Sequence, residues 1–413
     1  MGKKGRENLK MRKEEKGITL VALIITIVVM LILVAVSINI VVNSNLIGHA
    51  EKTGDAYAGA IKNEEKLGND GITINDKEYA SIDDYIESRK PLPEGAGKKF
   101  TETKEYTDGT KTAVIPGGFT VSGIRNETKI DGGLVIYLIP DDELESVKWD
   151  GTEKTKYDQF VWIPVTNVNK MFMCQSKTAK TECNIELVNG TPTCTNHSNS
   201  ISMAGRLYAT SLGGNINSSL TTQTYNANDG LREPAIITGK STGTGTQYDG
   251  SNTDNNIGLK LSTLQEEYNN AVKKVIESKG FWIGRYETSG MSSSNSNDST
   301  TILSVVAGKG TSDGISKVNW YRMYKQQQNY ANKKELDTSK IQSTMIFGAA
   351  YDQTMIFANC EKATTPTKDY STVKTGNVET DCYKNIYDLC GNLREWTTEA
   401  IFTTARVSRG RLF

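Results

Sequence analysis

The chain has 413 residues, and its 48 Lys and Arg side chains balance its 48 Asp and Glu side chains. This length suits two or three domains, and a neutral chain without a basic stripe does not suit a nucleic-acid partner. The two histidines are isolated and no C-x-x-C occurs, which argues against a zinc site. Six cysteines lie in two groups of three; their spacing leaves both disulfides and free thiols open.

Residues 18–42 form the most apolar stretch and carry no charged side chain. As a helix the stretch would be about 37 Å long, which exceeds the ~30 Å of a bilayer core. Seven basic and three acidic residues precede Gly17, so the positive-inside rule keeps the N-terminus in the cytoplasm. We therefore predict a single-pass protein of the cell membrane, with its C-terminal domain extracellular. A cleaved signal peptide fits less well, because its apolar core would be shorter.

Helical spacing of apolar residues continues beyond the apolar stretch and predicts an amphipathic extension of the same helix, over 18–67 in all. Residues 68–99 are interpreted as a linker. Within it the acidic stretch before Pro91 suits one strand and one helical turn, and residues 91–97 are rich in Pro and Gly.

The junction of a basic leader, residues 1–17, with an apolar helix resembles the prepilin cleavage site of type IV pilins and pseudopilins. The resemblance implies that prepilin peptidase cuts between Gly17 and Ile18, and that the new terminus is methylated. Met11 is an alternative start of the leader. The fifth mature residue of a pilin is usually Glu, whereas this chain has Ala22, which weakens the case for filament contacts with other pilin-like subunits.

Short apolar runs separated by Gly-rich turns predict strands in residues 100–165. Residues 160–165, FVWIPV, are apolar on both faces and suit a central strand. A polar insertion over about 170–258 is expected to be a long loop with few ordered pieces. The expected strands are Thr112–Ile115, Phe119–Val121, Leu134–Ile139 and Phe160–Val165.

Helices are predicted after the insertion. A capping-box pattern at Ser262 opens the first, which Gly280 is expected to end. A strand over Phe281–Glu287 follows, then a helix from about Val318 and another that contains Met345 and Ile356. The expected class for residues 100–413 is α+β with long irregular loops.

Six sequence motifs in this part of the chain resemble, in the same order, segments of the formylglycine-generating enzyme (sulfatase-modifying factor) domain, a variant of the C-type lectin fold. They are FVWIPV, GFWIGRYETS, VNWYRMY, STMIFGAAYDQTM, NIYDLCGNLREWTTEA and VSRG. The resemblance covers residues 100–413 without the insertion, and it implies a C-type-lectin-like domain that is truncated at its C-terminus.

The same resemblance implies a calcium site in the motif YDLCGNLREW. The family's equivalent positions bind a structural calcium ion, and here they are Asp388, Gly391, Leu393 and Glu395. Carboxylate and carbonyl oxygens are ligands that calcium prefers. A turn without metal, in which Glu395 caps backbone amides, is the alternative.

No catalytic residue is expected. Family members that oxidise a sulfatase cysteine use paired cysteines beyond a segment at which this chain ends. Arg285 and Glu287 either pair with each other or line a site, and we favour an ion pair. We therefore predict a membrane-anchored surface protein with a non-catalytic lectin-like head that binds an extracellular protein or glycan. The alternatives are a structural pilin or pseudopilin subunit and, if the sequence is truncated, a formylglycine-generating oxidase.

Overall fold

The computed structural model describes thirteen stretches of the chain in two compact units, 1–90 and 91–413. The described residues are 27–31, 72–75, 77–175, 180–182, 184–195, 203–205, 231–232, 261–290, 302–313, 320–360, 373–389, 391–401 and 405–409. The predicted cleavage residues Gly17 and Ile18 lie outside these stretches, as does Ala22.

The long N-terminal transmembrane helix is not supported and is corrected here. Among the described residues, no helix has the length and apolarity needed to cross a bilayer. Of the predicted helix over 18–67, the structure describes only residues 27–31, which are helical.

The described end of the first unit is a small hairpin followed by a helix. Strands β1 (Ile72–Ile74) and β2 (Lys77–Tyr79) pair antiparallel, and helix α3 spans Ile82–Arg89. Ser81 caps this helix by accepting a hydrogen bond from the Asp84 amide, and acidic residues follow in the first turn. The acidic stretch of the predicted linker therefore folds into two strands and a helix.

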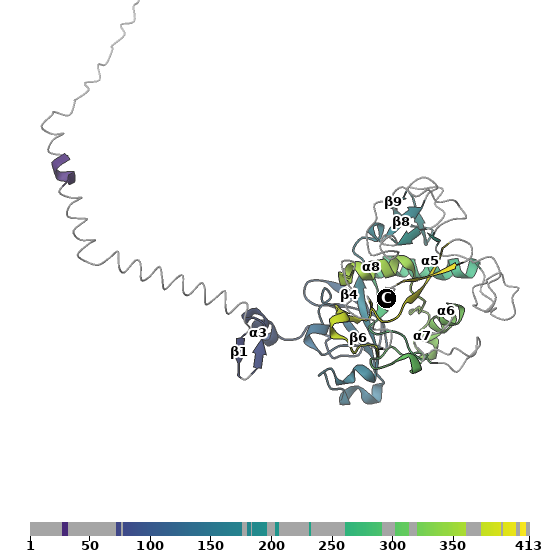
Figure 1. The fold of residues 1–413 in the computed structure, drawn as a ribbon, viewed down its shortest axis with the longest axis horizontal. Coiled ribbons are helices and arrows are strands. Elements are labelled where there is room, and N and C mark those ends of the chain that lie inside the picture. Colours follow the sequence, from purple (N-terminus) through teal and green to yellow (C-terminus); the bar gives the residue numbers. More distant parts are fainter. Residues whose placement is uncertain are drawn as a thin grey trace, which may run out of the picture. The chain divides into compact units, whose positions relative to one another are not determined.

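The second unit is mixed α/β with small sheets (Figure 1). Its centre is a four-stranded antiparallel sheet in the order β14-β7-β6-β5. Its strands are β5 (Thr120–Val121), β6 (Val135–Leu138), β7 (Asp158–Pro164) and β14 (Gly280–Gly284). The prediction of FVWIPV as a central strand is confirmed. Strand β14 lies at one edge of the sheet.

The two faces of the central sheet bury different clusters, because side chains alternate along each strand. Val161, Ile163 and Ile283 pack against helix α8 (Gly348–Ala358), and Phe281 also meets helix α5 (Leu261–Ser278). Phe160, Trp162 and Trp282 belong to the other face, which the hairpin of β3 (Lys104–Thr107) and β4 (Thr112–Ile115) covers.

Gly280 is required for packing and not for ending helix α5. The left-handed residue that follows this helix is Lys279, with φ 56°. A Cβ at Gly280 would lie 2.2 Å from Cζ2 of Trp162 and 2.6 Å from the Ile163 carbonyl oxygen. The glycine therefore lets β14 lie against the buried indole of β7.

The polar insertion contains more strands than its composition predicts. Strands β8, β9 and β12 form a three-stranded sheet in the order β12-β8-β9, and β10 and β11 form a hairpin. Residues 206–230 and 233–260 of the insertion lie outside the described part. The bounds are β8 (Phe172–Gln175), β9 (Lys180–Glu182), β10 (Ile185–Val188), β11 (Thr191–Cys194) and β12 (Met203–Gly205).

The C-terminal part adds two helices and a second three-stranded sheet, in the order β13-β17-β18. A buried ionic cluster fixes this sheet against helix α8: Arg409 pairs with Glu399 and lies 3.6 Å from Asp352. The elements are β13 (Leu231–Arg232), α6 (Trp320–Gln328), α7 (Tyr330–Lys333), β15 (Cys382–Tyr383), β16 (Ile386–Tyr387), β17 (Glu395–Ile401) and β18 (Ala405–Arg409). Short 3-10 turns lie at Arg125–Glu127, Asp141–Ser146, Thr152–Thr155, Val168–Lys170, Thr311–Asp313 and Glu379–Asp381.

Candidate functional site

A cavity of about 580 Å³ lies along strand β14. All five residues of β14 line it. Other lining residues are 341–344, 346, 347 and 393–396, with Met323 and Gln327 from helix α6. Cavities of roughly 300–1,000 Å³ with mostly apolar walls are typical of small-molecule sites. The cavity is therefore the candidate functional site of the described residues.

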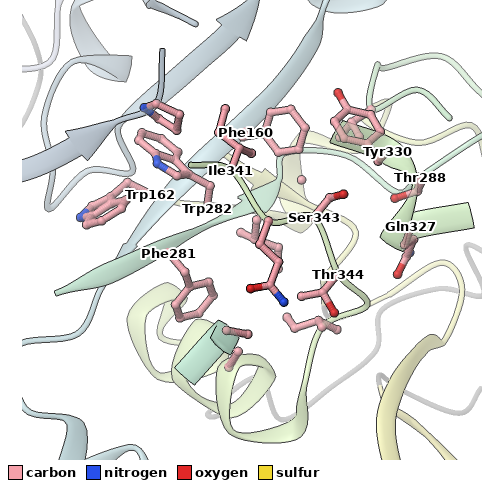
Figure 2. Close-up of a pocket in the computed structure, with 18 of the residues that line it drawn as sticks. Phe160, Trp162, Phe281, Trp282, Thr288, Gln327, Tyr330, Ile341, Ser343 and Thr344 are labelled. Carbon is pink, nitrogen blue, oxygen red and sulfur yellow. The ribbon is translucent and has the colours of Figure 1, made fainter. Parts of the chain in front are cut away.

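The walls of the cavity are mainly apolar, and they include aromatic side chains from both faces of the sheet. Figure 2 shows Phe281 and Trp282 on opposite sides of β14, with Trp162 beside Trp282. The rings of Trp162 and Trp282 are 5.1 Å apart, and the Trp282 indole donates a hydrogen bond to the Val114 carbonyl. These contacts hold the Trp282 indole in place, so this wall is formed before any ligand binds.

The polar wall comes from Thr288, Gln327, Ser343 and Thr344 (Figure 2). Ser343 is held in place, since its hydroxyl donates to the Gln328 carbonyl and accepts from the Ala331 amide. In contrast, the buried Oε1 of Gln327 has no hydrogen-bond partner within the described part of the chain. A buried acceptor without a partner costs free energy.

Two carboxylates, Glu287 and Glu395, also line the cavity. Burial, and then the nearby Asp388 charge, raises the pKa of Glu287 to about 8. Burial and the Glu287 charge raise the pKa of Glu395 well above its ordinary value, and its Oε2 has no described hydrogen-bond partner. The cavity therefore has one acidic end.

Glu287 fixes the turn before β17. Its Oε1 accepts from the Leu393 amide at 3.0 Å, and its Oε2 accepts from the Asn392 side chain at 2.6 Å. Both carboxylate oxygens are thus occupied by the turn. This arrangement gives Glu287 a positioning role and explains why a carboxylate is buried there.

The predicted ion pair between Arg285 and Glu287 is wrong. Arg285 pairs instead with Glu127, at 2.7 Å, on the buried side of the strand. Residues two positions apart share a face within a strand, but β14 ends at Gly284, so strand geometry no longer places Arg285 and Glu287 side by side. Glu127, which sequence reasoning missed, lies in a 3-10 turn with no strand pattern to mark it.

The four predicted calcium-binding residues all lie in or beside one turn. Asp388 is buried in a left-handed conformation, with φ 63°, and its Oδ2 accepts hydrogen bonds from Thr375 and the Gly376 amide. Leu393 and Glu395 line the cavity, whereas Asp388 and Gly391 do not.

The turn fits a calcium ion in part. The partnerless Oε2 of Glu395 suits a hard cation, whereas the two donors on Asp388 already occupy one of its oxygens. Within the described stretches, no cluster of three or more acidic, His or Cys side chains is arranged to hold a metal ion. Calcium binding at this turn stays a prediction.

Two cysteines differ in chemical state. Cys360 is disulfide-bonded and buried against the central sheet. Cys382 is a free thiol, half-buried beside Tyr286 and Tyr387, and burial raises its pKa. The thiol is therefore protonated near neutral pH, which makes it a poor nucleophile.

Comparison with known proteins found no match, whether among protein-family models, curated proteins or solved structures. The resemblances to prepilins and to the formylglycine-generating enzyme domain therefore stay predictions.

Proposed function

We propose that residues 91–413 form a non-catalytic binding module that takes the apolar or aromatic part of an extracellular ligand into the cavity along β14. The cavity itself is the observation that carries this proposal. It combines a preformed aromatic wall, formed by Trp162 and Trp282, with polar side chains such as Thr288 and Thr344. Such a site orients a ligand through few polar contacts and gains most of its affinity from apolar burial.

The disulfide at Cys360 supports a location outside the cytoplasm. Disulfides persist in oxidising compartments and are rare where thioredoxin and glutathione keep thiols reduced. The proposal therefore places the module at the cell surface, in contact with ligands from outside.

A binding role is favoured over oxidase chemistry by the state of the cavity residues. The free thiol of Cys382 is not among the residues that line the cavity, and its raised pKa opposes thiolate formation. The carboxylate of Glu287 is occupied by two donors of the adjoining turn. A calcium ion held by Asp388 and Glu395 would also have a structural role, since it would neutralise the charge of the acidic turn.

Ligand binding is tested by fluorescence titration of the full chain with 8-anilinonaphthalene-1-sulfonate, followed by a thermal-shift screen of aromatic amides, oligosaccharides and short peptides. The matched variants are Thr288→Phe, which fills the cavity, and Thr191→Phe, which adds the same ring at an exposed position of the β10–β11 hairpin. We expect Thr288→Phe to lower dye affinity at least tenfold and Thr191→Phe to leave it unchanged. Equal dye binding by the two variants would place the ligand site elsewhere.

A further inference from the structure

Strand β14 has an edge with no described strand beside it. It pairs with β7 on one side and ends the four-stranded sheet on the other. Exposed sheet edges are usually protected by Lys, Pro or a bulge, because they can pair with another chain. Strand β14 has the sequence Gly-Phe-Trp-Ile-Gly, which contains no charged residue and no proline.

The register shows which backbone groups point to this edge. The Val165 amide donates to the Lys279 carbonyl, and the Arg285 amide donates to the Gln159 carbonyl, so odd-numbered residues bond to β7. Backbone groups alternate along an antiparallel strand, and those of Trp282 and Gly284 therefore point away from β7. The Gly280 carbonyl on the same edge accepts from the Ser278 hydroxyl.

The cavity follows this edge and opens to both faces of the sheet. Trp162 and Trp282 line it on one face, and Phe281, Ile283 and Phe347 line it on the other. A strand laid beside β14 would place its alternate side chains against these two walls. A compact apolar ligand would contact the walls but would leave the edge-facing backbone groups of Trp282 and Gly284 without partners among the described residues.

We propose that the ligand of the cavity is an extended peptide segment of another protein, which adds to β14 as a fifth strand. The proposal rests on the proposed function, and it names the ligand class of the same site. Main-chain hydrogen bonds to Trp282 and Gly284 give affinity, and apolar side chains on both faces give specificity. Five peptide residues, about 16 Å, match the length of β14.

The test uses the full chain and two heptapeptides, each with lysine at both ends and five central valines. Both peptides carry two backbone N-methyl groups and so have the same apolarity. In the first, the methyl groups lie two residues apart and leave one edge of the peptide free. In the second, they lie on adjacent residues and block both edges.

We expect the first peptide to bind and the second to bind about tenfold more weakly, because the second loses at least one main-chain hydrogen bond. Hydrogen–deuterium exchange should slow at residues 280–287 only with the first peptide. Equal affinity of the two peptides would overturn strand addition. Binding of anilinonaphthalene sulfonate with no binding of either peptide would overturn it too but would leave the proposed function standing. Failure of the dye and of both peptides would overturn both.

Discussion

Loss of the Arg285 side chain should destabilise the second unit strongly. Arg285 Nη1 lies 2.7 Å from Glu127 Oε1, and the two side chains are only 8% and 5% exposed. Glu127 also accepts hydrogen bonds from Ser122 and Tyr137, so its charge is built into the core. Arg285→Met removes the counter-charge, and an unpaired buried charge costs about 3–5 kcal/mol.

A double-mutant cycle isolates the pair. Arg285→Met, Glu127→Gln and the double variant are compared by urea unfolding. We expect the double variant to be about 1–3 kcal/mol more stable than the sum of the two single effects predicts. The matched cycle uses Glu287→Gln in place of Glu127→Gln, and its coupling should stay below about 0.5 kcal/mol. A larger coupling with Glu287 than with Glu127 would refute the assigned pairing.

Three further predictions concern the same region. Gly280→Ala should lower the free energy of unfolding by about 1–3 kcal/mol, because the added Cβ overlaps Trp162. The control Gly132→Ala should change it little, because a Cβ at that position has room. Urea unfolding midpoints compare the two variants. Glu287, with its pKa raised from 4.5 to about 8, keeps a proton that the unfolded chain has released, so stability should fall as pH rises from 4.5 to 8. Glu287→Gln should flatten this fall in thermal melts, and an unchanged slope would count against the raised pKa. If the turn binds calcium, calcium at about 100 times its dissociation constant should stabilise the chain by ~2.7 kcal/mol, an effect that EGTA and Glu395→Gln should each abolish.

Local patterns in the sequence predicted several elements of the second unit. The apolar run FVWIPV became the central strand β7, and the stripe after Ser262 became helix α5. Both succeed because burial on one or both faces of an element leaves a mark at short spacing. The strands of the polar insertion were missed, because the surrounding composition is polar and a hairpin such as β10–β11 is mostly exposed, including its apolar residues Leu187 and Val188.

The candidate site was not predictable in the same way. Its walls come from segments as distant as Thr103, Trp282 and Trp396, and no short pattern records that they meet. The sequence identified Arg285 and Glu287 as a charged pair only because they are close in the chain. Their true partners, Glu127 and the turn at Asn392, are far away in the sequence and adjacent only after folding.

The most direct test of ligand binding along β14 is a crystal structure of the full chain with the first valine peptide, whose N-methyl groups block only one of its edges. We predict an extended peptide in the cavity, antiparallel or parallel to β14, with main-chain hydrogen bonds to Trp282 and Gly284. An empty cavity, with the peptide bound at another surface or absent at saturating concentration, would contradict this assignment.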